Sequence, residues 1–276
     1  MRVILTEPTG FCFGVRRAVR LTEGALNQGT KDVYCLGPLI HNNLVVERLR
    51  QKGVRVIKRL SEADRGKVII RTHGTQPDVL LEAKQKKIEL LDATCPFVKS
   101  SQQIAKRLSE EGYQVVIAGD KRHPEIESLL GFSKGDTIVI EPGIKKLPVL
   151  KKRIGILAQT TCSKEAYLKL MQSVLKRDFA ELRIFNTICD DTLHRQKAVL
   201  KLSCKVDLML VIGGKNSANT KRLFQICRQT GVETHHIENA ERLNPEWLKG
   251  KRNTGLASGA STPDWIVEEI LKKIKK

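Results

Sequence analysis

One arrangement occurs three times along this chain of 276 residues: a cysteine follows a short apolar segment and precedes a helical pattern. The copies are GFCFGVRRAV around Cys12, DATCPFVKSS around Cys95 and NTICDDTLHRQKAV around Cys189, at separations of 83 and 94 residues. Repetition at a fixed scale indicates one supersecondary unit written several times. We therefore expect three related units, at residues 13–95, 96–188, and 189–276 together with 1–12.

Two polar positions follow each cysteine at similar spacing, and each comes directly after an apolar strand candidate. The residues 28 or 29 positions beyond the cysteines are His41, His123 and Ser217. The residues 61 to 72 positions beyond them are His73, Thr160 and Ser261. Ligands of open parallel sheets bind at the carboxyl ends of the strands. Three units about a pseudo-threefold axis would thus bring three cysteines and six polar loops to one central site. The alternative is a chance coincidence, since α/β chains repeat at this scale and loops are polar.

Short Val- and Ile-rich segments alternate with amphipathic helical patterns along the whole chain. Strand candidates run from Arg2–Thr6 to Thr254–Ala257, and helix candidates run from Gly14–Gln28 to Thr262–Lys275. Between the helix candidate Asn219–Thr230 and the last strand candidate we expect no strand. Alternating strands and helices predict an α/β fold with mainly parallel sheets and crossover connections.

The charge and composition restrict the class of partner. A formal net charge of +19 favours anionic partners, namely nucleic acid, an acidic protein or phosphorylated small molecules, although a solvated basic surface explains it equally well. Aromatic residues make up only 4% of the chain, which argues against a base-stacking surface. We expect no signal peptide, because the first residues match a strand, and no apolar run is long enough to span a bilayer. We expect a cytoplasmic protein with free thiols and no membrane partner.

The three repeated cysteines favour a metal centre over buried thiols or nucleophiles. Each is expected at a helix N-terminus, where the helix dipole lowers a thiol pKa and accommodates anionic sulfur. Structural zinc usually takes four ligands, often in close pairs, and no such pair exists here. Three widely separated cysteines suit an iron–sulfur cluster in which one iron lacks a protein thiolate. The other cysteines are expected without a direct role, and Cys35, Cys204 and Cys227 as buried small hydrophobes.

The polar loops are interpreted as an anion cradle of neutral or cationic donors. Its candidate residues are His41, His73, Ser217, Asn219 and Ser261. Several precede a helix, whose free N–H groups favour anions, although each residue alone would be an ordinary helix cap. Glu125 lies two residues after His123 and could deliver a proton to a metal-bound substrate, in preference to Glu127. A glutamate at a helix start can also serve only to compensate the dipole.

An ordered set of motifs resembles a known family over nearly the whole chain. The stretches are GFCFGVRRAV, LGPLIHN, RTHG, DATCPFV, GDKRHPE, AQTT, RQ after the third cysteine, GGKNSANT and SGASTPDWI. Together they are similar to the 4-hydroxy-3-methylbut-2-enyl diphosphate reductases, iron–sulfur enzymes of the LytB type. The resemblance implies a trefoil of three α/β units around a central [4Fe–4S] cluster. It also implies reductive dehydroxylation of an allylic diphosphate to isopentenyl and dimethylallyl diphosphate, the last step of the methylerythritol phosphate route.

The resemblance also implies roles for individual residues. Cys12, Cys95 and Cys189 match the cluster ligands, and the substrate hydroxyl is expected on the unique iron. The positions that match the diphosphate site are His41, His73, Ser217, Ala218, Asn219 and Ser261. His123 and Thr160 match positions around the hydroxyl end, and Glu125 matches the proton source. Electrons are expected from ferredoxin or flavodoxin, acidic partners that suit the positive charge.

Two residues depart from the family pattern. We expect them to affect the reduction potential of the cluster and the affinity for substrate more than the class of reaction. Asp191 stands where a small residue is usual, and a carboxylate near the cluster would disfavour reduction unless it points to solvent. Ala218 stands where some relatives carry a serine hydroxyl, so one diphosphate contact would come from the backbone. Two other functions remain open: a cluster-dependent dehydratase without net electron transfer, and, ranked last, a nucleic-acid-binding protein with a structural metal.

Overall fold

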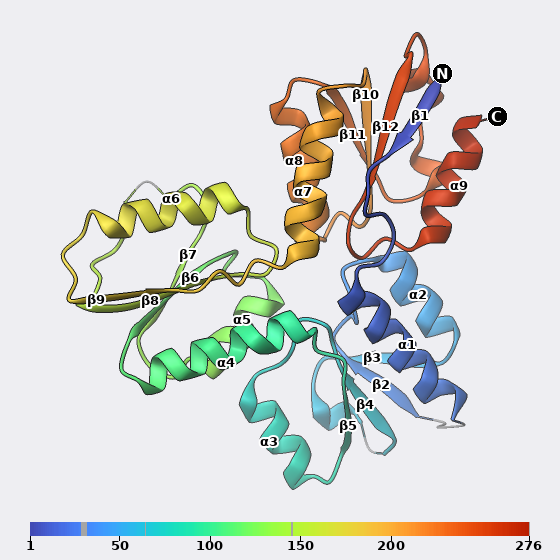
Figure 1. Cartoon of the computed structure of the whole chain (residues 1–276). Coiled ribbons are helices and arrows are strands. Elements are labelled where there is room, and N and C mark those ends of the chain that lie inside the picture. Colours follow the sequence, from blue (N-terminus) through green and yellow to red (C-terminus); the bar gives the residue numbers. More distant parts are fainter. Residues whose placement is uncertain (29–31, 64, 145, 276) are drawn as a thin grey trace. The chain divides into compact units, whose positions relative to one another are not determined.

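The computed structural model describes residues 1–28, 32–63, 65–144 and 146–275 of the chain (Figure 1). Residue 276, which ends the third expected unit, lies outside the described residues. The strands are β1 (Arg2–Leu5), β2 (Val33–Leu36), β3 (Val54–Ile57), β4 (Lys67–Ile70), β5 (Glu89–Asp92), β6 (Gln114–Ala118), β7 (Thr137–Ile140), β8 (Arg153–Ala158), β9 (Glu181–Ile184), β10 (Leu208–Ile212), β11 (Glu233–Ile237) and β12 (Asn253–Ser258). The helices are α1 (Phe13–Asn27), α2 (Asn43–Gln51), α3 (Pro77–Gln85), α4 (Pro96–Glu110), α5 (Pro124–Phe132), α6 (Lys164–Leu175), α7 (Asp190–Ser203), α8 (Ala218–Gln229) and α9 (Asp264–Lys275), with short 3₁₀ helices η1 (Leu60–Glu62), η2 (Ala240–Arg242) and η3 (Pro245–Leu248).

The strands form three four-stranded sheets with one repeated strand order. Sheet A has the order β1-β12-β10-β11, sheet B the order β5-β4-β2-β3 and sheet C the order β9-β8-β6-β7. Every strand pairing among the described residues is parallel. In each sheet the strand before a repeated cysteine lies at one edge (Figure 1). The expected α/β class with parallel sheets is therefore confirmed, and the repetition seen in the sequence is a repetition of topology.

Sheet A shows why these strands are apolar throughout. All five residues of β10 are buried. Leu210 packs with Ile270 of α9 on one face, whereas Met209 and Val211 pack with Leu223 of α8 on the other. Successive strand residues point to opposite faces, and helices cover both faces of a parallel sheet. This covering on both faces explains why β10 is apolar at every position.

Sheets B and C have cores of the same kind. The five residues of β6 in sheet C are buried, and Ile117 packs with Leu108 of α4 and Leu129 of α5. In sheet B, Val68 of β4 packs with Ala83 of α3. These cores place the carboxyl ends of the central strands under the loops that carry the predicted site residues.

The chain divides into two compact units. Unit 1 comprises Met1–Arg16, Ile40–Leu49 and Asp190–Lys276, and unit 2 comprises Arg17–Leu39 and Arg50–Cys189. Sheet A belongs to unit 1, and sheets B and C belong to unit 2. The three-unit boundaries that the cysteine spacing predicts remain a prediction.

One strand was not expected from the sequence. β11 pairs with β10 in parallel register, with Leu210 opposite His235. Its sequence ETHHI carries four polar residues in five, and it lies at the edge of sheet A, where only Ile237 is buried. This edge strand buries little apolar surface, so hydrophobic patterning did not reveal it. Among the described helices, none combines the length and apolar character that crossing a bilayer requires.

The packing of sheet A predicts a large cost for Leu210→Ala. Leu210 is fully buried between strands and α9, so its truncation should lower the free energy of unfolding by about 2–5 kcal/mol. The matched control is Leu200→Ala on α7, where the leucine is 50% exposed and the change should stay within about 0.5 kcal/mol. Urea titration monitored by circular dichroism measures both. Equal midpoints for the two variants would contradict the assigned core.

Candidate active site

Each repeated cysteine directly precedes a helix and is held by the same kind of backbone bond. α1 begins after Cys12, α4 begins after Cys95 and α7 begins after Cys189. The Cys12 amide donates to the carbonyl of Ala260 at 3.0 Å, within unit 1. The Cys95 amide donates to Thr72 O at 2.9 Å, and the Cys189 amide donates to Thr160 O at 3.0 Å, both within unit 2. All three acceptors lie in the loops after β12, β4 and β8, so the three cysteines occupy equivalent positions at the carboxyl ends of their sheets.

Unit 2 brings two of the thiols into one electrostatic environment. Burial raises the pKa of the Cys95 thiol, and the neighbouring Cys189 and Glu125 raise it further. The N–H groups of Phe97 and Val98 in the first turn of α4 act in the opposite direction. The helix N-terminus therefore lowers the pKa of Cys95 as expected, but burial raises this pKa by more. Two thiols and a carboxyl group that repel one another when ionised form a site that a cation would stabilise.

Glu125 is the buried carboxyl group of this site. Only 1% of the residue is exposed, whereas Glu127 on the same helix is exposed and lies 3.6 Å from Arg71. One Glu125 oxygen accepts from the Thr160 amide and the other from the Thr160 hydroxyl, each at 2.7 Å. Burial raises the pKa of Glu125 to about 7, against the lowering effect of both bonds to Thr160. A carboxyl group with such a pKa can hold and release a proton near neutrality.

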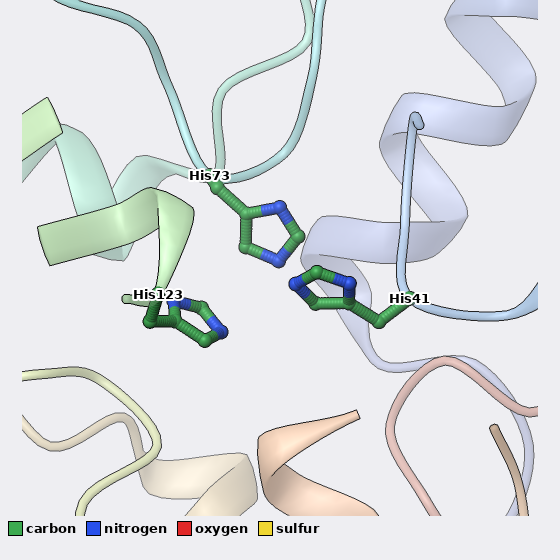
Figure 2. A group of neighbouring side chains, drawn as sticks. All are labelled: His41, His73 and His123. Carbon is green, nitrogen blue, oxygen red and sulfur yellow. The ribbon is translucent and has the colours of Figure 1, made fainter. Parts of the chain in front are cut away.

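Two histidines lie at the start of α5, the helix that carries Glu125. His123 is the N-cap of α5, and its Nδ1 accepts from the Glu125 amide at 3.1 Å, which places the proton of a neutral ring on Nε2. Figure 2 shows the ring of His73, from the turn after β4, near the ring of His123. The two ring centroids are 5.1 Å apart in a T-shaped contact. His41, which the figure also labels, belongs to unit 1.

The turn that carries His73 is held by a polar network that the sequence patterns did not predict. Gln102 Nε2 on α4 donates to Ser128 Oγ on α5 at 2.6 Å, and this hydroxyl donates to the Thr75 carbonyl at 3.0 Å. Gly74 has φ +76°, and a Cβ there would lie 2.4 Å from Gln102 Nε2. Only glycine fits this turn. The one available signal was a polar residue, Gln102, on the apolar face of a helical pattern.

In unit 1, three loops meet around the His41 carbonyl. Ser261 Oγ donates to this carbonyl at 3.3 Å, and Asn42 Nδ2 donates to the Ser261 carbonyl at 3.0 Å. Asn42 Oδ1 accepts from the amide of Leu44, so the same side chain caps α2. A Cβ on Gly214 would lie 2.5 Å from the His41 oxygen, which requires glycine in the loop after β10. Backbones can therefore approach closely here, as anion-binding loops require.

The N-terminus of α8 carries the remaining predicted anion ligands. Ser217 is its N-cap and accepts from the Thr220 amide at 3.3 Å, and Ala218 is its first residue. Asn219 is only 3% exposed, and neither atom of its side-chain amide has a hydrogen-bond partner among the described residues. Buried amide groups are normally satisfied, so an unsatisfied pair beside a helix N-terminus fits a bound polar ligand.

The other cysteines mostly lie where the sequence predicted. Cys35, Cys162 and Cys227 are buried, and burial raises the pKa of Cys35 and of Cys227 to about 12. Cys204 is exposed, so the expectation that it is buried was wrong. α7 ends at Ser203, which leaves Cys204 in the turn beyond the packed helix face.

Comparisons with known proteins show the family of this chain. A model of the LytB protein family matches residues 3–275. A 4-hydroxy-3-methylbut-2-enyl diphosphate reductase of Pelobacter propionicus is 46% identical over 276 residues, which cover 99% of this chain and 98% of that protein. A reductase of the same name from Geotalea uraniireducens is 45% identical over 278 residues, covering 100% of this chain and 98% of that protein.

Solved structures agree with the sequence comparison. A structure of (E)-4-hydroxy-3-methyl-but-2-enyl diphosphate reductase, the terminal enzyme of the non-mevalonate pathway, is 41% identical with a TM-score of 0.73, covering 100% of this chain and 99% of that chain. The E-1-hydroxy-2-methyl-but-2-enyl-4-diphosphate reductase from Plasmodium falciparum is 28% identical with a TM-score of 0.93, covering 100% of this chain and 88% of that chain. With matches of this identity along nearly its whole length, the chain belongs to the LytB protein family.

Proposed function

We propose that the chain reduces (E)-4-hydroxy-3-methylbut-2-enyl diphosphate to isopentenyl and dimethylallyl diphosphate, the last step of the methylerythritol phosphate pathway. Two electrons and two protons enter, and the substrate hydroxyl leaves as water. The relatives carry the name of this reductase. The observation within the chain that carries the proposal is the buried Glu125 carboxyl, with a pKa of about 7, in the environment of Cys95 and Cys189.

The cysteines fit an iron–sulfur cofactor. Cys12, Cys95 and Cys189 would hold a [4Fe–4S] cluster, because each cysteine directly precedes a helix at the carboxyl end of a sheet. When bound, the cluster supplies electrons and polarises the leaving oxygen. When ionised, Cys95, Cys189 and Glu125 would repel one another. A bound cationic group would offset this repulsion, which supports a metal-containing cofactor at this place. With three cysteine ligands, such a cluster would keep one iron without a protein thiolate, available to the substrate.

Glu125 is proposed as the residue that delivers the proton. Its protonated carboxyl group would donate toward the leaving hydroxyl, and Thr160 keeps both oxygens oriented through its amide and its hydroxyl. His123 holds the same turn through its bond to the Glu125 amide. The buried setting excludes water, so the proton is retained for the substrate.

The diphosphate is proposed to bind the polar loops. Ser217, Ala218 and Asn219 would offer the first-turn N–H groups of α8, a hydroxyl and an otherwise unsatisfied amide. His41, His73 and Ser261, which match the family's diphosphate positions, are proposed as further donors. Because Ala218 has no side-chain hydroxyl, its contribution is its backbone.

The electrons are proposed to come from an acidic donor in the cytoplasm, such as ferredoxin or flavodoxin. The net charge of +19 supports it, since opposite charge accelerates encounter between protein partners. An electron requirement separates this function from a cluster-dependent dehydratase. Anaerobic turnover should consume two electrons per product from a reduced donor, and product formation without a reductant would favour the dehydratase.

Glu125→Gln should abolish most turnover while the protein keeps its cluster and its substrate binding. The amide cannot supply a proton, and general acids contribute about a hundredfold or more to such steps. Glu127→Gln is the matched control, because Glu127 is exposed on the same helix and should leave turnover unchanged. Anaerobic assays of product formation measure both. A Glu125→Gln rate near that of the wild type would remove Glu125 from proton delivery.

The turnover number should fall as pH rises through about 7. Burial raises the pKa of Glu125 to about 7, and the proposed acid acts in its protonated form, which is lost above that pH. Assays at saturating substrate across this range measure the profile. The residual activity of Glu125→Gln should lack this limb, because an amide does not titrate. A rate that increases as pH rises through 7 would show that Glu125 acts in its ionised form.

Cys95→Ser should prevent assembly of an intact cluster. A serine hydroxyl replaces a thiolate that the cluster needs, so the brown chromophore and the iron content of about four per chain should be lost. Cys204→Ser is the matched control, since this exposed cysteine should not affect iron content. Visible absorption of anaerobically purified protein, before and after dithionite, distinguishes them. A fully loaded, active Cys95→Ser protein would refute the ligand assignment.

A further inference from the structure

We propose that Arg195 is a positioning residue whose guanidinium holds the segment before Cys12, with Asp191 as its charge partner. The proposal deepens the function given above, on which the ligand role of Cys12 rests. Every contact that carries it lies within unit 1.

Arg195 is a buried cation on α7, with 2% of the residue exposed. Its Nε donates to Asp191 Oδ2 at 2.7 Å, and its Nη2 donates to Asp191 Oδ1 at 3.2 Å. The two residues are one helical turn apart, so the pair forms within a single helix. Burying a charge is costly unless it is paired and hydrogen-bonded, and Asp191 supplies the countercharge.

The remaining donors of Arg195 reach two other segments of the chain. Nη2 donates to the Gly10 carbonyl at 3.0 Å, and Nη1 lies 3.3 Å from the Pro8 carbonyl. Nη1 also donates to the Ser258 carbonyl at 2.8 Å and contacts its hydroxyl at 3.3 Å. One planar guanidinium thus joins α7 to the β1–α1 connection and to the end of β12. A lysine, with a compact ammonium group, cannot present this fork.

The two segments carry proposed ligands and are bonded to each other. The Gly10 amide donates to Ser258 Oγ at 3.0 Å, and the Cys12 amide donates to the Ala260 carbonyl at 3.0 Å. Cys12 is two residues beyond Gly10, and Ser261 follows Ala260 directly. Fixing Gly10 and Ser258 therefore fixes the backbone that aims the cysteine and the serine.

This geometry also accounts for Asp191, the residue that departs from the family pattern. As a lone carboxylate two positions after Cys189 it would oppose cluster reduction. In the structure it neither points freely to solvent nor stands alone, because both of its oxygens accept from Arg195. A close pair of opposite charges produces a far weaker field than a single anion. Asp191 acts through Arg195, as the group that orients it.

The experiment is amide hydrogen exchange of metal-free Arg195→Lys, which keeps the charge and loses the fork. The Gly10 and Cys12 amides report directly, since the network engages both. Their exchange should accelerate about tenfold or more, because hydrogen bonds to a charged group are lost. Arg107→Lys is the matched control: Arg107 lies in another pair one helical turn apart, with Glu111, but exposed on α4. It should leave the exchange of these two amides unchanged.

Asp191→Ala provides a second test if Arg195→Lys does not fold. It keeps Arg195 and removes the carboxylate that orients it, so the same amides should exchange faster while circular dichroism stays that of the wild type. Exchange within about twofold of the wild type in the folded variants would overturn the proposal. A uniform acceleration over the whole of unit 1 would also overturn it, since Arg195 would then contribute only general stability.

The cofactor-loaded protein separates this proposal from the proposed function. Arg195→Lys should lose iron to a chelator about tenfold faster than the wild type, and Arg107→Lys at the wild-type rate. Equal iron loss in Arg195→Lys and the wild type would break the link between Arg195 and Cys12. A wild-type protein that takes up no cluster would instead contradict the proposed function, and the exchange result would still decide the role of Arg195.

Discussion

The backbone bond from each repeated cysteine to a loop of its own sheet is the contact on which the rest of the site depends. In each case the acceptor follows the strand that pairs with the edge strand before the cysteine, as Thr72 follows β4 for Cys95. The strands are parallel, so their carboxyl ends lie at the same edge of the sheet. The bond therefore brings a thiol, a polar loop and a helix N-terminus to that edge without any side-chain contact.

Burial determines which chemistry these groups can perform. Glu125 and Glu127 lie two residues apart on α5, yet the first is enclosed and titrates near neutrality whereas the second lies exposed near Arg71. Burial likewise raises the pKa of Cys95 despite the N–H groups of α4. Groups buried in this way keep their protons near neutral pH until a cation or a substrate shifts their pKa values.

Much of the fold and of the candidate site could be predicted from the sequence, because both rest on local patterns. A buried central strand such as β10 is continuously apolar, and the polar residues after the central strands stand at the strand ends that parallel sheets use for ligands. Hydrophobic patterning did not predict elements that are only partly buried, or buried side chains that are polar. β11 is a polar edge strand, and Cys204 lies just past the end of its helix. Gln102 and Arg195 are polar residues on buried helix faces, and only tertiary structure shows what they contact.

The triple occurrence of the cysteine bond has a consequence for how such a protein can diversify. The acceptors Ala260, Thr72 and Thr160 contribute a main-chain oxygen, which every amino acid possesses, so each copy can change its side chains while the cysteine stays in place. Thr160 also donates to Glu125 through its side-chain hydroxyl, whereas Ala260 has no hydroxyl. Three equivalent backbone hydrogen bonds thus support unequal chemistry, because the differences lie in side-chain atoms that these bonds do not use.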